Sequence, residues 1–355
     1  MSHAITLTAA FVLALGATAL ITPATIWLAC RMAFYDHPHD YKQHAAATPY
    51  LGGVAVVVGL LVGSCALGSR LGEFDAIIAA AVALLVVGTV DDRVGLDIAL
   101  RVALETGAAV ALFYAGVGWS VFGTEAADLL LTIVFVIGVV NAFNLMDNLD
   151  GATSTIALVL SAAIALYTTI EGQVALAALA LALTGACAGF LPFNLASPRA
   201  RIFLGDGGSM AIGITLAGLM MSVPGIEGFG WELIPVIVVF VGLPALDTAL
   251  VIVSRLRRRV AVLSGGRDHL THRLLQRLGS TRRVAVVLAG GQAVLSGMAI
   301  ALLAADPDVA LAASCILIAC GIVLLVALEG PRWRSPVGAT EPAVSPIAAS
   351  EESPA

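Results

Sequence analysis

Charge is scarce in this sequence. Of its 355 residues, 12% are Asp, Glu, Lys or Arg and 59% are hydrophobic, and the mean hydropathy is +0.99. Soluble domains carry about 25% charged residues. The composition therefore excludes an ordinary soluble domain and predicts an integral membrane protein. The longest basic stretch, RLRRRV at 255–260, follows an apolar run, where membrane proteins commonly place arginines, so no nucleic-acid partner is expected.

Paired cysteines are absent, and lysine nearly so. The five cysteines form no CxxC pair and lie in or beside apolar runs, so we interpret them as small core residues rather than redox or metal sites. The first residues, MSHAITLT, contain no Lys or Arg and lead into an apolar stretch too long for a signal peptide, so none is expected. Lys42 is the single lysine, a compact charge suited to a phosphate.

Long apolar runs, by contrast, fill the chain. A membrane-spanning helix needs roughly 20 apolar residues. The pattern predicts an all-α polytopic membrane protein with about 10–11 transmembrane helices in one domain, residues 1–330, followed by a tail, 331–355, that we expect to be disordered. The predicted helices are 5–30, 50–68, 75–90, 97–116, 128–146, 152–170, 174–192, 208–223, 231–254, 284–305 and 309–328.

The basic residues indicate how these helices are oriented. With the N-terminus outside, 17 of the 18 Lys and Arg residues fall on one face, and only Arg70 falls on the other. By the positive-inside rule, the arginine-rich face is cytoplasmic. Unrelated loops would scatter polar clusters over both faces, so we expect one shared cytoplasmic site. The clusters on that face are DHPHDYKQHAAATPYLGG (36–53), DDRVGLD (91–97), NAFNLMDNLDG (141–151), FNLASPRARIFLGDGGS (193–209) and GGRDHLTHRL (265–274).

Carboxylates and amides dominate two of these clusters. Asp91 and Asp92 end an apolar run, and paired carboxylates at a membrane boundary suit the binding of a cation or a proton, with a solvated loop as the alternative. In NAFNLMDNLDG, three asparagines share one helical face at i, i+3, i+7 spacing beside two aspartates. Helix capping would need only one or two of these five residues. An oxygen-rich site of this kind suits Mg²⁺.

Two further clusters suit phosphate. Asp206 lies between glycines before an apolar helix, where the backbone and the helix N-terminus can approach an anion, although a plain turn would look the same. His269 and His272 share a helical face beside arginines, which favours phosphate oxygens over zinc, with a basic surface loop as the alternative. Together, the acidic and basic groups predict phosphoryl transfer at a membrane surface.

The motifs TPYLGG, DDR, NAFNLMDNLDG, FNLASPRARIFLGDGGS, LPALDTALVIVSR and DHLTHRL, in this order, resemble those of the polyprenyl-phosphate N-acetylhexosamine-1-phosphate transferases. The resemblance covers roughly residues 30–280. It implies that a polyprenyl phosphate, undecaprenyl or decaprenyl, attacks the β-phosphate of a UDP-N-acetylhexosamine in the bacterial plasma (inner) membrane. UMP leaves, and a lipid diphosphosugar that starts a cell-envelope polysaccharide is formed, with Mg²⁺ or Mn²⁺ as cofactor.

The same resemblance implies roles for individual residues. It implies catalytic roles for Asp91, Asp92 and Asp147, and metal ligation by Asn144 and Asp206. It also implies that Asp247 supports the site from within the bilayer and that the chain forms a homodimer. The substrate contacts that it implies are Lys42, Asn141, Asp150, Asn194, Phe203, His269, His272 and Arg273.

Some positions depart from the family's muramoyl-pentapeptide enzymes. Asn148 replaces a Gly, HLTH replaces an HHH run, and Gly95 stands where a lysine is often found. These departures favour a simple sugar phosphate, with UDP-GlcNAc as the first donor to consider. A phospho-N-acetylmuramoyl-pentapeptide transferase is the alternative within the family, and a secondary transporter or an inactive scaffold are the alternatives outside it. Transporters place their sites near the midplane, often in inverted repeats, and the sequence shows neither feature.

Overall fold

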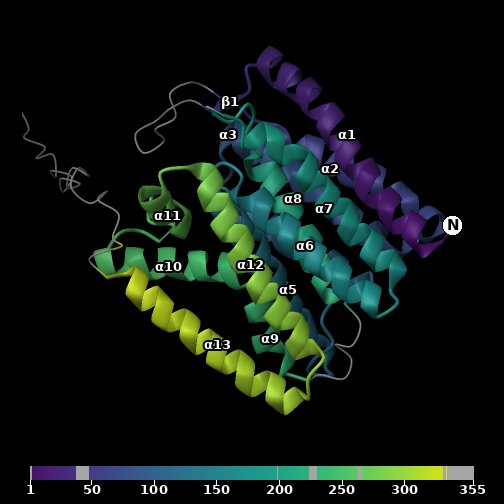
Figure 1. Ribbon diagram of the computed structural model, residues 1–355, viewed down its shortest axis with the longest axis vertical. Coiled ribbons are helices and arrows are strands. Elements are labelled where there is room, and N and C mark those ends of the chain that lie inside the picture. The colour runs from purple at the N-terminus through teal and green to yellow at the C-terminus, as the bar shows by residue number, and fades with distance from the viewer. Residues whose placement is uncertain are drawn as a thin grey trace, which may run out of the picture.

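The computed structural model describes residues 2–36, 48–197, 199–223, 230–262, 266–330 and 333. Apart from one pair of two-residue strands and one 3-10 segment, the regular elements are α-helices (Figure 1). The elements are α1 (His3–Arg31), β1 (Tyr35–Asp36), β2 (Thr48–Pro49), α2 (Gly52–Ser64), η1 (Cys65–Phe74), α3 (Asp75–Val94), α4 (Ile98–Tyr114), α5 (Glu125–Met146), α6 (Ala152–Ile170), α7 (Val174–Asn194), α8 (Gly205–Met221), α9 (Leu233–Phe240), α10 (Gly242–Arg258), α11 (Leu270–Leu278), α12 (Thr281–Leu303) and α13 (Pro307–Leu328).

All eleven predicted apolar runs are helical, which confirms an all-α polytopic membrane protein. Within the described residues, seven helices are long and apolar enough to cross a membrane, or eight if α9 and α10 form one span. This is fewer than the 10–11 spans predicted. The helices α4 and α8 have only 17 residues each, and α3 has 20 residues that include charged ones at its ends. The predicted tail lies outside the described residues apart from Trp333.

The run 231–254 is not the single span that the sequence predicted. It forms α9 and α10, which meet at an angle of 85°. Pro244 has no N–H to donate to the carbonyl oxygen of Phe240, so the helical hydrogen bond at this position cannot form. The buried side chain of Gln292, from α12, donates to that oxygen instead (2.8 Å). The carbonyl oxygen of Phe240 at the break is thus paired by a residue 52 positions away, which no local sequence pattern predicts.

Helix α8 is the central element of the bundle. In Figure 1, α1 and α13 form opposite edges and α8 lies between them; it packs chiefly against α3, α5 and α2. Every residue of α8 is buried except Asp206 in its first turn. Gly88 lets α3 approach the start of α8 closely, because a Cβ there would lie 2.4 Å from the backbone nitrogen of Gly207. This approach brings the end of α3 against the start of α8.

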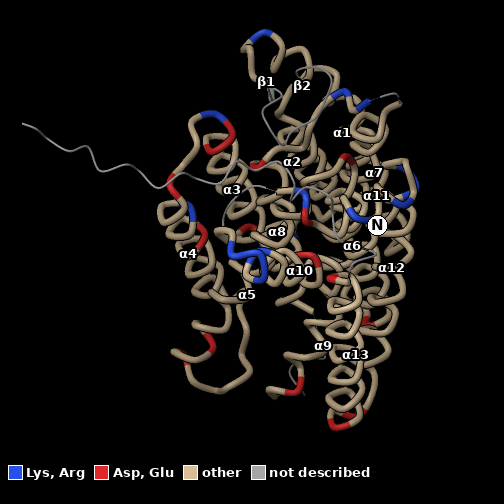
Figure 2. Tube along the Cα trace, turned by 90° about the vertical axis from the view of Figure 1, so that its left-hand side faces the viewer, with Lys and Arg blue, Asp and Glu red and all other residues tan. Residues whose placement is uncertain are grey.

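The ends of many helices meet at one end of the bundle, which we call the polar end. Here α3, α5, α7 and α10 end, and α4, α6, α8 and α11 begin. Backbone hydrogen bonds join the two segments that lead into α2 and α8, from Gly52 N to Phe203 O (3.0 Å) and from Phe203 N to Pro49 O (2.9 Å). In Figure 2 the loops at the opposite end, below α9 and α13, carry Asp and Glu in red. The side of the membrane that each end faces stays a prediction.

Candidate active site

The site is centred on Asp206, whose side chain is 37% exposed although the rest of α8 is buried. Asn144, in the last turn of α5, donates from Nδ2 to Asp206 Oδ1 (3.0 Å) and to Ser209 Oγ (3.1 Å). These residues are 62 and 65 positions apart, and the packing of α5 on α8 brings them together. The structure therefore places the two predicted metal ligands side by side.

The aspartate pair at the end of α3 has two different environments. Asp91 accepts hydrogen bonds from the backbone nitrogen of Leu96 (2.6 Å) and from Arg101 (3.1 Å). Asp92 accepts from the backbone N–H groups of Asp206 and Gly207, at the start of α8. A carboxylate at a helix N-terminus satisfies donors that have no partner within the helix and interacts favourably with the helix dipole. Asp92 thus caps α8 from a neighbouring helix.

Arg101 also belongs to the site. The sequence analysis counted it only among the basic residues that orient the helices. Its guanidinium group donates to Asp91 and to Asn141 Oδ1 (3.3 Å), and lies 4.0 Å from Asp206 Oδ2. Its Nε atom lies 3.8 Å from the buried Glu105, one turn further along α4. Two ionisable residues at i, i+4 spacing in an otherwise apolar helix are the sequence signal that could have identified this pair.

Asn141 faces the same network. Its Nδ2 atom donates to Glu105 Oε2 (2.5 Å) and to Ile137 O (3.0 Å), while its Oδ1 accepts from Arg101. It therefore links α5 to α4. The chain of contacts from Glu105 through Arg101 to Asp91 and Asp206 places one cation beside several carboxylates.

Asp147 follows directly after α5 and increases the negative charge of the site. Burial, together with the nearby charges of Asp206 and Asp92, raises the pKa of Asp147 well above its ordinary value. Asp150, three residues further on, is half-buried and also contributes to this rise. Burial is the larger cause of this rise, and the neighbouring carboxylates add to it, so a cation bound beside them would favour the charged form of Asp147.

Asn148 does not share a helical face with the other two asparagines, contrary to the prediction. Helix α5 ends at Met146, and Asn148 lies in the turn that precedes α6. Its Nδ2 donates to Leu145 O (2.6 Å), and its Oδ1 accepts from the hydroxyl of Thr271. Asn148 therefore fixes the turn and connects it to α11.

Asn194 is the last residue of α7, and Phe203 lies on the segment that leads from it into α8. Asn194 is buried, accepts from the backbone nitrogen of Gly151 (2.7 Å) and donates to Ile202 O (3.0 Å). It therefore joins the NLDG turn to the segment before α8. The ring of Phe203 lies 6.1 Å from that of Tyr50 in a tilted arrangement. Their contact with a nucleotide stays a prediction.

His269, the residue before α11, and His272, in its first turn, lie near the buried Asp247 of α10. His269 Nδ1 lies 2.8 Å from Asp247 Oδ2, and the backbone nitrogen of Leu270 donates to Asp247 Oδ1 (2.6 Å). The ring centroids of His269 and His272 are 6.2 Å apart. Burial, followed by the charges of His269 and Arg267, lowers the pKa of His272 to about 4. Asp247 thus fixes His269 and the start of α11. Its role in supporting the site stays a prediction.

The side chain of Arg273 is surrounded by protein atoms and does not face an open site. It is buried and donates to the backbone oxygens of Asp268 (3.1 Å) and Leu328, and to Glu329 Oε1 (2.6 Å). These contacts tie α11 to the end of α13. Its predicted contact with substrate finds no support in this geometry. Lys42 lies outside the described residues.

The donor set fits a hard divalent cation. Among the described residues, no group of three or more His, Cys, Asp or Glu side chains is arranged to hold a metal ion by itself. Mg²⁺, however, is usually held by one or two carboxylates together with water and substrate phosphates. Asp206 and Asn144, with Asp147 nearby, supply oxygen ligands of this kind, and the mutual repulsion of the carboxylates would be relieved by a cation.

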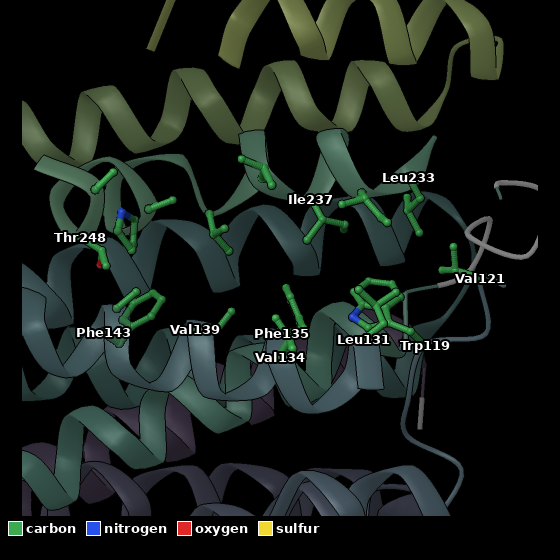
Figure 3. Close-up of a pocket in the computed structure, with 18 of the residues that line it drawn as sticks. Trp119, Val121, Leu131, Val134, Phe135, Val139, Phe143, Leu233, Ile237 and Thr248 are labelled. Atoms are coloured by element: carbon green, nitrogen blue, oxygen red, sulfur yellow. The ribbon is translucent and has the colours of Figure 1, made fainter. Parts of the chain in front are cut away.

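An apolar groove runs between α5 and the bent pair α9–α10 (Figure 3). Its volume is about 360 Å³, and apart from Thr248 and the Trp119 indole its lining side chains are apolar. Figure 3 shows Phe143 and Thr248 at one end and Leu233 and Val121 at the other. Phe143 precedes Asn144 and Thr248 follows Asp247, so this end of the groove lies toward the end of the bundle that carries the acidic cluster. The sequence analysis missed this groove because the bend between α9 and α10 creates one of its walls.

Comparison with known proteins gives a consistent set of relatives. The model for glycosyl transferase family 4 matches residues 74–223. The decaprenyl-phosphate N-acetylglucosaminephosphotransferase of Mycobacterium tuberculosis is 34% identical over 302 residues, which cover 74% of each chain. The enzyme of the same name from Mycolicibacterium smegmatis is 34% identical over 77% of each chain. The undecaprenyl-phosphate alpha-N-acetylglucosaminyl 1-phosphate transferase of Escherichia coli is 27% identical over 74% of each chain.

Proposed function

The chain belongs to glycosyl transferase family 4, and on this premise we propose that it transfers N-acetylglucosamine-1-phosphate from UDP-GlcNAc to a polyprenyl phosphate. An oxygen of the lipid phosphate attacks the β-phosphorus of the donor, the bond to the UMP oxygen breaks, and a lipid diphosphosugar forms. The observation that carries the proposal is the pairing of Asn144 with Asp206 at the polar end, toward which one end of an apolar groove points.

The groove suits the lipid acceptor. A prenyl chain is apolar along its length and carries its phosphate at one end, so it needs an apolar channel that opens on a polar site. The groove between α5 and α9–α10 has this form, because its lining is apolar and one end reaches Phe143 and Thr248. In this arrangement the acceptor phosphate lies beside Asn144 and Asp206 while its tail stays among the membrane helices.

The acidic cluster suits a magnesium ion. Asp206, Asn144 and Asp147 are the residues that would hold it, and Asp206 has the exposed carboxylate that a ligand from solution can reach. Bound Mg²⁺ neutralises the charge of the two phosphates, which otherwise repel one another and the aspartates. Asn144 fixes the position of the Asp206 carboxylate through its Nδ2 hydrogen bond.

Asp91 and Asp92 are proposed to act by positioning other groups. Asp92 holds the start of α8, and Asp91 holds Arg101 within 4.0 Å of Asp206. A phosphate monoester loses its second proton at a pH near 6, so at neutral pH the acceptor oxygen is already charged and needs no general base. Arg101 supplies a positive charge at the point where the two phosphates would meet.

The same site suggests its side of the membrane. A UDP-sugar is a cytosolic compound, and the arginine-rich loops lie at the same end of the bundle as the acidic cluster, as the positive-inside rule requires of a cytoplasmic face. We therefore place the polar end at the cytoplasmic surface of the bacterial inner membrane.

The proposal is tested with the purified chain in detergent, a polyprenyl phosphate, UDP-GlcNAc and Mg²⁺. Release of UMP and formation of a lipid diphosphosugar are followed with and without EDTA. Metal-dependent formation of both products is expected. The Asp206→Asn variant should lose turnover while remaining folded, and Asp308→Asn, an exposed aspartate at the far end of the bundle, should keep it.

Three results would contradict the proposal. Full turnover by Asp206→Asn would remove Asp206 from the site, and full turnover in EDTA would remove the metal. UMP release only from UDP-MurNAc-pentapeptide would assign the donor to the muramoyl branch of the family.

A further inference from the structure

A second cavity at the polar end shares no residue with the apolar groove. Its volume is about 570 Å³, and it lies between α1, β2, the end of α7 and the residues 196–197 and 199–201. Its walls are of two kinds. Pro23 and Ile26 of α1 and Phe193 of α7 form an apolar side, whereas Arg199 and Arg201 form a cationic side.

The two arginines carry charge that the protein does not neutralise. Both are exposed, and among the described residues neither guanidinium group has an acidic or other polar partner. The arginines at positions 101, 255 and 273 are, by contrast, all paired with carboxylates. The backbone nitrogen of Arg201 donates to Phe193 O (2.9 Å), so the segment that bears the arginines is fixed to the end of α7.

The position of the cavity relates it to the membrane surface. Both α1 and α7 are long and apolar enough to span a bilayer. Pro23 and Ile26 lie within the last three turns of α1, and Phe193 lies in the last turn of α7. The apolar wall therefore belongs to the ends of two membrane helices, and the arginines lie just beyond them. Such a place lies at the level of lipid headgroups, where a ligand is apolar on one side and charged on the other.

We propose that this cavity binds an anionic phospholipid, with its headgroup phosphate on Arg199 and Arg201 and its acyl chain along Ile26 and Phe193. Two arginines that share a phosphate give the charge-assisted contacts that favour an anion. A soluble phosphate would use only the cationic wall and would leave the apolar wall exposed to water. The proposal goes beyond the proposed transfer reaction, because it assigns this cavity to a lipid that is neither the donor nor the acceptor.

The bound lipid would also brace the segment that leads into α8. Asn194 fixes one end of this segment to Gly151, and Ile202 near its other end accepts a hydrogen bond from Asn194. Lipid at Arg199 and Arg201 would add a further contact to the residues between these two hydrogen bonds.

The test measures binding of phosphatidylglycerol to the full chain in detergent micelles, by native mass spectrometry and by titration of a fluorescent phosphatidylglycerol. The variant is Arg199→Gln with Arg201→Gln. An arginine near a bilayer contributes about 1 kcal/mol of attraction to anionic lipid, so the double variant should bind roughly thirtyfold more weakly. Arg259→Gln with Arg283→Gln is the matched control, because it removes two exposed arginines from the same end and should bind normally.

Further binding experiments distinguish a lipid phosphate from a soluble phosphate. Phosphatidylcholine should compete weakly, and so should glycerol phosphate, which has the headgroup phosphate without the acyl chain. The Ile26→Trp variant fills the apolar side and should weaken lipid binding without any change in charge. If glycerol phosphate or inorganic phosphate competed as well as the lipid, the cavity would belong to a soluble anion and the proposal would be overturned. Unchanged binding by the double variant would overturn it as well.

The outcome is independent of the proposed transfer reaction. Binding is measured without turnover, and Asp206→Asn should bind phosphatidylglycerol as the unmodified chain does. The double arginine variant should retain basal turnover in detergent alone, because neither arginine contacts the acidic cluster.

Discussion

Replacing Glu329 with glutamine is expected to destabilise the protein and to displace α11. Glu329 lies at the end of α13, and its side chain is 5% exposed. It accepts a hydrogen bond from Arg273 (2.6 Å), whose side chain is 2% exposed. Through this pair, the last helix holds α11, which carries His272, and the His269 turn that precedes it. Although Glu329 is far from the acidic cluster in the sequence, its replacement should displace His269 and His272.

The magnitude follows from burial. Removing one partner of a buried ion pair leaves an uncompensated charge and commonly costs about 3–5 kcal/mol. Arg273 keeps acceptors at Asp268 O, Leu328 O and Ser254 Oγ, and glutamine retains one oxygen, so we expect a loss near the lower limit, about 3 kcal/mol. The contact from Arg257 (3.7 Å) adds at most about 1 kcal/mol, because that side chain is 51% exposed.

The assay is thermal unfolding of the purified chain in detergent, read together with turnover. The matched control is Glu171→Gln, an exposed glutamate at the end of α6, which should leave both quantities unchanged. A second comparison uses Glu329→Met alone and with Arg273→Met. Because apolar replacement of both partners avoids the unpaired charge, the double variant should be more stable than the single one. The reasoning would be refuted if Glu329→Gln unfolded like its control, or if the double variant were the less stable.

Three further predictions follow from the packing and charge of the site. Gly88→Ala should force α3 away from α8 and reduce turnover. Gly107→Ala is the control and should leave turnover unchanged, because its Cβ would meet no atom within 4 Å. Equal effects of the two substitutions would contradict this prediction. Asp247→Asn should lower turnover about a hundredfold by misplacing His269, with the fold retained in circular dichroism, and full activity would show that the pair is dispensable. The pKa of His272 is lowered to about 4 from 6.5, so its contribution to stability is present above pH 6.5 and lost as the pH falls towards 4; the unfolding temperature should fall less over this range in His272→Gln.

Local patterns were enough to predict the class of protein and the helix ends at which the candidate site residues lie. A long apolar run in a membrane has to satisfy its backbone hydrogen bonds within itself, which favours a helix, and all eleven predicted segments are helical. The aspartates after such a run, and the glycines around Asp206, mark helix ends directly in the sequence, and the structure places them there. The pairing of Asn144 with Asp206 was predicted through the resemblance to a family, since their separation of 62 residues shows no periodicity.

Other features depend on which helices pack together, and no local pattern encodes that. Arg101 belongs to the site because α4 packs on α5, and Asp92 caps α8 because Gly88 lets α3 approach it. The contact of Arg273 with Glu329 at the end of α13 was likewise not visible in the sequence around either residue. The sequence by itself thus determined a helical membrane protein with its polar residues at helix ends. Only the tertiary structure decided which of them meet, because contacts between residues 60 or more positions apart depend on side-chain packing across helices.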